Sequence, residues 1–328
     1  MLRTDFYTSW IGMYLAQSFL HSLVAALIVD TALAAWNIER PQVRQRFRFL
    51  VLLLPIIMFP VYQTISPDRS TPIARLDAVF DITRWFNLEL WGAVPVSVLF
   101  AATLVFTAAV FLFQELLPII RHTTASDETE PGMTRPDPGS PLAAALEAIP
   151  GPAVDVWVIE DQDCIIFSST GRSPAIFLSQ GLLSALASEE LRAALAHEIA
   201  HIRRSRRPYM SLIFLLRICM FYNPVILMEF RRIVQEEEKI CDDLAAELAG
   251  SREAMAGALR KFSSCETDAI RSSEDLSHIR EKIEEYSHSM MIESRIARLE
   301  EPLPRCAHAG IVFAVVLATI LSINYYLV

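Results

Sequence analysis

Four long apolar stretches are the feature that most constrains the fold of this chain of 328 residues. They run from about Trp10 to Trp36, Phe47 to Tyr62, Leu90 to Leu117 and Ile311 to Leu327. A helix needs about 20 apolar residues to cross the hydrocarbon core of a bilayer. Hydrophobic residues make up 53% of the chain, which is more than in a typical soluble domain. The sequence therefore predicts a mainly α-helical membrane protein with about four transmembrane helices.

Three polar residues, Gln17, His21 and Asp30, interrupt the first apolar stretch. Because polar side chains are costly against lipid, we expect them to face other helices. For Asp30, close to the end of the stretch, a position at the membrane interface is the alternative.

The arginines between the first and second stretches predict the orientation in the membrane. Arg40, Arg44, Arg46 and Arg48 stand against the single acid Glu39. Short loops rich in Lys and Arg lie on the cytoplasmic side. The five cysteines are scattered without a Cys-x-x-Cys pair, and this favours reduced thiols and a reducing compartment. We therefore expect a multi-pass protein of the bacterial inner (cytoplasmic) membrane, with the domain after the third stretch on the cytoplasmic side.

His197-Glu198-Ile-Ala-His201 is the motif that carries chemistry, and it lies in a helix predicted from Ser188 to Arg204. Two histidines four residues apart project from one helix face, so both can bind one zinc ion. Glu198 follows the first histidine and is the expected general base for an attacking water. A match of five residues also arises by chance, so a third ligand is needed to support the site.

The third ligand is expected on a second helix, within Arg231 to Glu247. Glu238 and Asp242 are four apart and share a face of that helix. Glu238 is the candidate third zinc ligand, and Asp242 is placed to accept the other N–H of a zinc histidine. Cys241 favours a packing role over a ligand role. The alternative for the whole acidic run is a solvated helix face, which we expect for Glu236 and Glu237.

The two motifs together resemble the BlaR/MecR-type membrane zinc metallopeptidases, which are Glu-zincins, and more distantly HtpX and the CAAX prenyl protease. Three further segments are similar to that family: Phe221 to Leu227, Ser173 to Leu183 and Ser294 to Leu299. The resemblance implies Zn²⁺ as cofactor and peptide-bond hydrolysis as the reaction. The β-lactam sensors of the family carry an extracellular sensor domain after the last span. This chain is expected to lack it, and so to respond to another trigger.

The fold class expected from these observations is a mainly α membrane protein with an α+β Glu-zincin metallopeptidase domain. Strands are expected at Val154 to Ile159, Cys164 to Phe167 and Ala175 to Leu178, because these runs are rich in β-branched and apolar residues. The expected domains are a three-helix transmembrane region (1–120), a linker (121–152), a cytoplasmic zinc metallopeptidase domain (153–305) and a C-terminal transmembrane helix (309–328).

The apolar segment 209–230 lies between the histidine motif and Glu238, and this restricts its path. A single crossing would leave Glu238 and the histidines on opposite sides of the membrane. We therefore expect a re-entrant or interfacial hairpin, with its turn at Asn223-Pro224. Arg217 within the segment is expected to snorkel towards water.

Residues Ala175, Ile176, Phe177 and Leu178 are the candidate substrate-binding residues. In zincin folds the strand before the zinc helix often offers an edge to which an extended peptide adds by backbone pairing. A covered strand in the domain core is an equally weighted alternative.

The function expected is that of an integral-membrane zinc endopeptidase that cuts a cytoplasmic or membrane protein in regulatory signalling. The alternatives are an HtpX-like quality-control protease and a non-catalytic membrane regulator with a structural zinc site. The implied partners are a protein or peptide substrate, such as a transcriptional repressor or membrane protein, and the lipid bilayer; a partner subunit or homo-oligomer is a further option. The net charge of −9 argues against a nucleic-acid partner.

Overall fold

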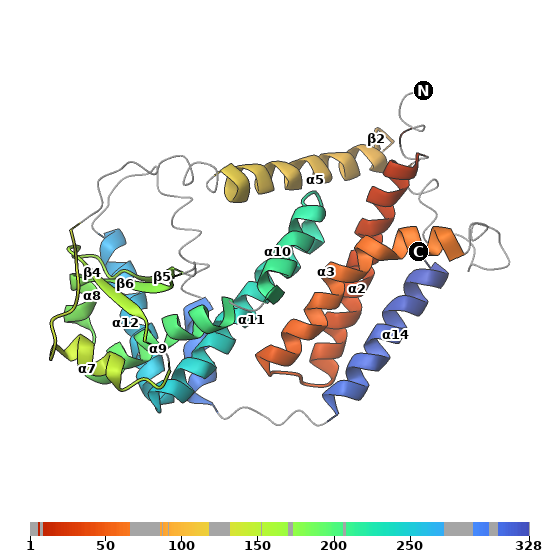
Figure 1. Ribbon diagram of the computed structural model, residues 1–328. Helices are drawn as coiled ribbons and strands as arrows, with labels where there is room; N and C mark the ends of the chain where they lie inside the picture. The colour runs from red at the N-terminus through yellow and green to blue at the C-terminus, as the bar shows by residue number, and fades with distance from the viewer. Residues whose placement is uncertain are drawn as a thin grey trace. The chain divides into compact units, whose positions relative to one another are not determined.

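The computed structural model describes residues 6, 9–65, 86, 88–90, 92–117, 132–151, 153–169, 173–205, 208–271, 291–301 and 308–327. The chain folds as two compact units (Figure 1). The first unit comprises Met1–Asp127, Tyr209–Glu236 and Pro304–Val328, and the second comprises Glu128–Pro208 and Glu237–Leu303.

Among the described residues, the first unit has four helices long and apolar enough to cross a membrane. They are α2 (Trp10–Ala35), α3 (Pro41–Ile65), α5 (Val96–Phe111), which a π-helical turn (Leu112–Leu116) continues, and α14 (Ala309–Leu327). The expectation of about four membrane helices is thus confirmed. The third helix begins later than expected, because Glu89–Leu90 (β1) pairs with Val94–Pro95 (β2) before α5 starts.

Helices α2, α3 and α14 share one hydrophobic core. Ala25 and Val29 of α2 pack with Phe47 and Val51 of α3 and with Ile320 of α14, and all five side chains are fully buried. Figure 1 shows the three helices running side by side. The exposed side of these helices is apolar as well, so an apolar side chain does not by itself indicate a position in the core.

Polar residues on α2 face other helices, as the sequence predicted for Gln17 and His21, which are both buried. The Ser18 hydroxyl lies 3.1 Å from the Tyr222 hydroxyl, and the Asn223 amide donates to the Ser22 hydroxyl at 3.0 Å. In an apolar environment these hydrogen bonds satisfy polar groups that lipid tails cannot satisfy. They therefore fix the segment around Asn223 to α2.

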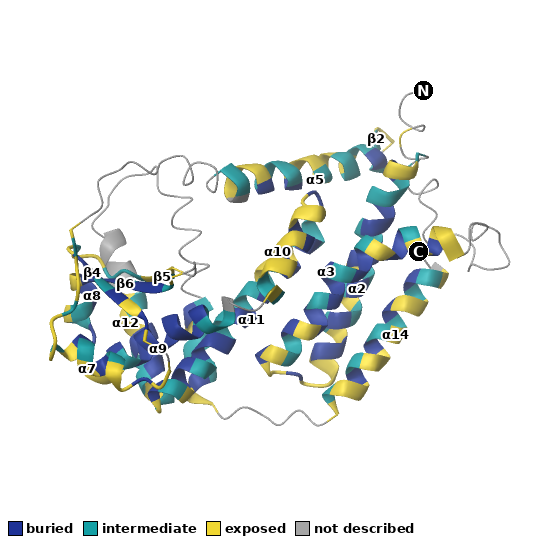
Figure 2. Cartoon of the chain, in the orientation of Figure 1, coloured by how far each residue is buried: buried dark blue, intermediate teal, exposed yellow. Residues whose placement is uncertain are grey.

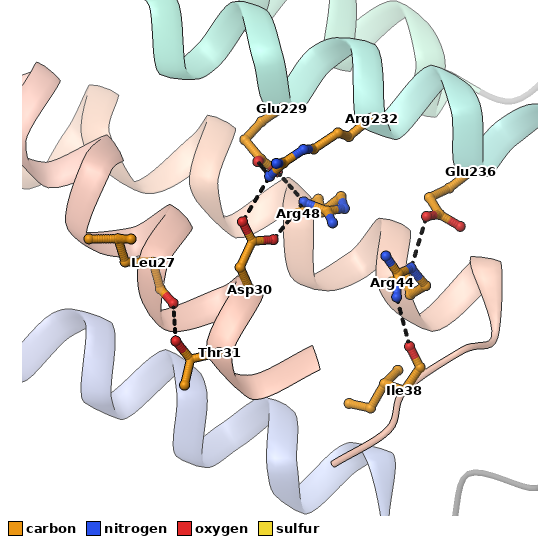
Figure 3. Close-up of polar contacts among 9 residues, drawn as sticks. All are labelled: Leu27, Asp30, Thr31, Ile38, Arg44, Arg48, Glu229, Arg232 and Glu236. Atoms are coloured by element: carbon orange, nitrogen blue, oxygen red, sulfur yellow. Dashed lines mark hydrogen bonds and ion pairs between the residues drawn. The ribbon is translucent and has the colours of Figure 1, made fainter. Parts of the chain in front are cut away.

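Asp30 belongs to a cluster of four charged residues that joins α2, α3 and α11 (Figure 3). Arg48 of α3 donates to Glu229 at 2.8 Å and to Asp30 at 3.2 Å. Arg232 donates to Asp30 at 2.8 Å and to Glu229 at 2.6 Å. Arg48 and Glu229 are buried, whereas the Asp30 side chain is 42% exposed. Asp30 thus contacts charged groups of two other helices, as expected for a polar residue in this apolar stretch.

The segment 209–230 forms a helical hairpin within the first unit. Its first helix begins one residue earlier, at Pro208, which belongs to the second unit. Helix α10 (Pro208–Cys219) is followed by a turn at residues 220–222 and by α11 (Pro224–Ala249). The Asn223 side chain accepts a hydrogen bond from the Val225 amide at 3.0 Å and so caps α11. The expected snorkelling of Arg217 is wrong, because this side chain is fully buried and its guanidinium lies 4.9 Å from the ring centroid of Phe111.

The second unit is an α+β domain built on a four-stranded sheet. Its strands are β3 (Met133–Thr134), β4 (Asp155–Ile159), β5 (Ile166–Ser169) and β6 (Ala175–Ser179), in the order β3-β4-β6-β5. Strands β4 and β6 are parallel, and the other neighbours are antiparallel. The described residues of the unit include the helices α7 (Pro141–Glu147), α8 (Gln180–Ala185), α9 (Ser188–Ser205), α12 (Arg252–Arg271), the second part of α11 and a helical segment at 291–300.

One face of this sheet packs against the helices to form the core of the second unit. Ile176 and Leu178 of β6 are fully buried with Leu195 of α9 and Leu182 of α8. Residues 193–200 of α9 are all buried and are dark blue in Figure 2. The helix that carries the histidine motif is therefore held in the core of the domain.

Part of the expected linker belongs to this domain. The structure has strand β3 and helix α7 within 121–152, and Leu142, Ala145 and Ile149 are buried in the core. The two-residue strand is too short to leave a periodic pattern, which is why the sequence suggested a linker there. Residues 121–131 of the expected linker lie outside the described residues.

The expectation that all five cysteines stay reduced is wrong for Cys164, which is disulfide-bonded. Cys219 and Cys241 are free. Sequence spacing identifies metal and redox pairs but not cysteines that the fold brings together from distant positions. The cysteine content therefore no longer supports a reducing compartment.

Gly181 has no room for a side chain, because a Cβ atom there would lie 1.9 Å from the carbonyl oxygen of Gln162. The Gly181 amide also donates to the Asp161 carbonyl at 2.9 Å, so the two backbones cannot separate freely. We expect Gly181→Ala to lower the free energy of unfolding by about 3 kcal/mol, measured as a fall in the thermal midpoint of the purified protein. Gly132→Ala is the control, because the nearest atom to an added Cβ there is a Glu160 side-chain oxygen at 3.4 Å, an ordinary contact. Equal midpoints for the two variants would contradict this packing.

Candidate metal centre

Helix α9 positions the two histidines, and local sequence explains why it forms. Glu189 and Glu190 lie in its first turn and Arg203 and Arg204 in its last turn, where each sign of charge complements the helix dipole. The Glu190 carboxylate accepts a hydrogen bond from the Ala187 amide at 2.9 Å. The observed helix, Ser188–Ser205, agrees with the predicted one.

His197, His201 and Glu238 are brought together in the second unit, with one ligand atom from each within 4.8 Å of the others. The two Nε2 atoms lie 3.0 Å apart, and Glu238 oxygens lie 3.5 Å from His197 Nε2 and 3.4 Å from His201 Nε2. Donor atoms of one tetrahedral zinc ion, each about 2.0–2.2 Å from the metal, are separated by about 3.3–3.6 Å. The two distances to Glu238 lie in this range, and the Nε2–Nε2 distance is about 0.3 Å below it, so the three residues fit one zinc ion once the histidine rings move slightly apart.

Asp242 lies behind His197, one helical turn after Glu238. Its Oδ1 atom is 3.1 Å from His197 Nδ1, on the side of the ring away from the donor cluster. A carboxylate at this distance from the ring nitrogen that faces away from the metal can fix the tautomer and the orientation of a metal-binding histidine. Burial acts to lower the pKa of His197, but the contacts with Asp242 and Glu238 outweigh it and raise the pKa to about 9. The position expected for Asp242 from the sequence is thus the one observed.

Arg295 is the neighbour of this cluster that the sequence did not single out. It donates to both carboxylate oxygens of Asp242, at 2.8 and 2.6 Å, and its Nη1 atom lies 3.4 Å from Glu238. Burial acts to raise the pKa of Asp242, but hydrogen bonds from Arg295 and His197 hold it below its ordinary value. Arg295 lies in the segment Ser294 to Leu299, which resembles a family motif, but that resemblance assigns no role to the arginine.

Glu198 is buried on α9 beside His197 and is 8% exposed. Among the described residues, the cluster able to hold a metal comprises the two histidines and Glu238, without Glu198. A carboxylate next to the first ligand but outside the donor set is available to move a proton.

Glu236 and Glu237 were expected to be solvated, and the structure contradicts this. Glu236 is 3% exposed and accepts a hydrogen bond from Arg44 at 2.8 Å within the first unit (Figure 3). Glu237 is 6% exposed and forms a two-bond contact with Arg204 within the second unit. The sequence could not show these partners, because Arg44 and Arg204 come from other helices.

The expectation that Ala175, Ile176, Phe177 and Leu178 bind substrate by backbone pairing is contradicted. These residues form β6, which already pairs with β4 on one side and with β5 on the other. The backbone N–H and C=O groups on both edges of β6 are therefore paired within the sheet. This confirms the alternative of a covered core strand. The outer strand on this side of the sheet is β5, and α9 lies alongside it.

Two histidines four apart on one helix and an acid from a second helix form a possible metal site of the kind found in metallopeptidases, and four helices among the described residues are long and apolar enough to cross a membrane. Comparison with known proteins agrees. Residues 169–259 match the family described as BlaR1 peptidase M56, which confirms the resemblance seen in the sequence. That segment contains the histidine motif, Glu238 and Asp242.

A curated relative extends the comparison. The chain is 34% identical over 79 residues to a protein described as "Protease HtpX homolog" from Methanothermobacter thermautotrophicus. The match covers 24% of this chain and 31% of the relative, so the chain spans about a third of the length of the curated relative it matches. Both comparisons are with proteins described as a peptidase or a protease.

Proposed function

We propose that this protein is an integral-membrane zinc-dependent endopeptidase. The observation that carries the proposal is the cluster of His197, His201 and Glu238, whose donor spacing fits one zinc ion. A structural zinc site usually has four protein ligands, whereas a catalytic site has three and an open position. Three metal donors with a buried carboxylate beside them support a catalytic zinc site over the structural zinc site of a non-catalytic regulator.

Zinc held at this site would polarise the scissile carbonyl and lower the pKa of the attacking water towards about 7. Glu198 takes the proton from that water and delivers it to the leaving nitrogen. Asp242 keeps His197 oriented through its Nδ1 atom, and Arg295 holds Asp242 in place.

The substrate proposed is an extended segment of a protein, and β5 (Ile166–Ser169) is the strand that supports its binding. β5 is the last strand in the sheet order and lies alongside α9. A peptide added to an outer strand gains main-chain hydrogen bonds without a particular sequence. This replaces β6 as the proposed peptide-binding strand.

We further propose that the catalytic domain is on the cytoplasmic side of a bacterial inner membrane and that cleavage serves regulatory signalling. The arginines at 40–48 support this side. A transcriptional repressor or a membrane protein is the proposed substrate, and a partner subunit or a second copy is a proposed associate. The second candidate is an HtpX-like quality-control protease, and the match to a relative described as an HtpX homologue supports keeping it.

Zinc removal tests the proposed function. We expect the purified full-length protein in detergent to contain about one zinc ion per chain and to cleave casein or itself. Treatment with a chelator should abolish cleavage, and added Zn²⁺ should restore it. Glu238→Gln should bind zinc much more weakly, because it loses a charged ligand. Stoichiometric zinc with no cleavage of any protein tested, before or after reconstitution, would instead support the non-catalytic regulator.

A further inference from the structure

Cys241 lies against the second zinc histidine, on the helix face that carries Glu238 and Asp242. Its Sγ atom is 3.6 Å from His201 Nδ1, and the side chain is fully buried. A nitrogen–sulfur separation of this size is compatible with an N–H···S hydrogen bond. The contact comes from α11, which supplies both Glu238 and Asp242, so one helix touches both histidines.

The geometry excludes Cys241 as a ligand of the same ion. His201 turns its Nε2 atom towards His197 Nε2 and Glu238, at 3.0 and 3.4 Å. Cys241 lies at the other nitrogen of the ring, which is away from that cluster. The cysteine therefore acts on His201 itself and has no place among the donors.

A neutral imidazole that binds a metal through Nε2 carries its hydrogen on Nδ1. That N–H requires an acceptor, which fixes both the tautomer and the orientation of the ring. For His197 the nearby acceptor group is the Asp242 carboxylate, 3.1 Å from Nδ1. For His201 the neighbouring group is the Cys241 sulfur, a weaker acceptor.

We propose that Cys241 is a positioning residue that orients His201 for zinc by accepting its Nδ1–H. This inference rests on the proposed zinc site. The two histidines are then held unequally, since a charged carboxylate stands behind His197 and a neutral thiol behind His201. Consecutive residues of α11, Cys241 and Asp242, thereby fix the two ligands that α9 provides.

Removal of the sulfur should weaken zinc binding because the buried Nδ1–H loses its acceptor. We expect Cys241→Ala to raise the dissociation constant for zinc about 10- to 100-fold, as is typical when such a partner is lost. Cys241→Ser should recover most of the affinity, because a hydroxyl oxygen also accepts N–H. Cys219→Ala is the matched control, since this free cysteine is exposed on α10. Competition with a chromophoric chelator measures the affinity.

Cobalt(II) substitution provides a readout that a general loss of stability would not mimic. The Nδ1–H protons of metal-bound histidines give shifted, exchangeable proton NMR signals, and two are expected in the wild type. In Cys241→Ala one of them should exchange rapidly with solvent and be lost, while the signal of His197 persists. Cys241→Ser should retain both signals.

Two different failures can be distinguished. If Cys241→Ala binds zinc as tightly as the wild type and keeps both NMR signals, the role of Cys241 is refuted while the zinc site stands. If the wild type itself binds no zinc, the proposed function fails. Should the alanine variant not fold, Cys241→Val fills the same space without an acceptor. Wild-type affinity and both signals in Cys241→Val would equally refute the inference.

Discussion

Replacing Glu198 with glutamine is expected to lower peptide-bond hydrolysis by about 10²- to 10⁴-fold, the range usual for loss of a general base. Glutamine has nearly the same shape but cannot take a proton from water. Because Glu198 is outside the cluster of His197, His201 and Glu238, the variant should keep a full complement of zinc. The measurement is kcat/KM on a peptide or protein substrate, together with the zinc content of the same preparation.

Glu189→Gln is the matched control for this prediction. It removes a carboxylate from the same helix, but from its exposed first turn, where the Glu189 side chain is 62% exposed. This variant should retain both zinc and activity. Undiminished proteolysis by Glu198→Gln would remove the general base from the proposed mechanism, whereas loss of zinc from that variant would show that Glu198 supports the metal site itself.

The local part of the site could be predicted from the sequence. The positions of His197 and His201 follow from helical periodicity, and the acidic start and basic end of α9 mark its limits. Glu238 and Asp242 could be paired with the motif because they share one helix face. Within a single helix, spacing determines which side chains point the same way, and the structure agrees with each of these relations.

Contacts between distant segments could not be predicted in this way. Arg295 reaches Asp242 from 53 positions further along the chain, and no periodic pattern relates the two. Strand β6 was interpreted as an edge because its own sequence does not reveal that β4 and β5 flank it. Pairing partners depend on the order of strands in the sheet, which is a property of the whole domain.

The arginines at the start of α3 show how tertiary contacts change the meaning of a charge pattern. The sequence has Arg40, Arg44, Arg46 and Arg48 beside a single acid, Glu39, which is a strong orientation signal. In the folded chain Arg44 pairs with Glu236 and Arg48 with Glu229 and Asp30. Two of the four positive charges are therefore neutralised by acids from other helices, so these arginines also hold the first unit together.

Arg48→Met is accordingly expected to destabilise the first unit by about 3 kcal/mol, near the lower end of the cost of breaking a buried ion pair. Methionine preserves the apolar length of the side chain but leaves Glu229, which is 1% exposed, with one cationic partner fewer. Arg232 still donates to Glu229 at 2.6 Å, and this keeps the loss from being larger. The thermal midpoint of unfolding in detergent, compared with that of the wild type, measures the effect.

The double variant Arg48→Met/Glu229→Gln separates loss of the pair from loss of packing. Once the buried charge is also removed, no uncompensated carboxylate remains, so we expect much of the lost stability to return. Arg46→Met is the control on the same helix, because Arg46 is exposed and its replacement should change stability by no more than about 0.5 kcal/mol. If Arg48→Met unfolds at the same temperature as Arg46→Met, the ion pairs of Figure 3 do not contribute to the stability of the helical unit. If the double variant is less stable than Arg48→Met alone, Glu229 contributes through Arg232 and Asp30 even without Arg48, and the cluster must be treated as one network.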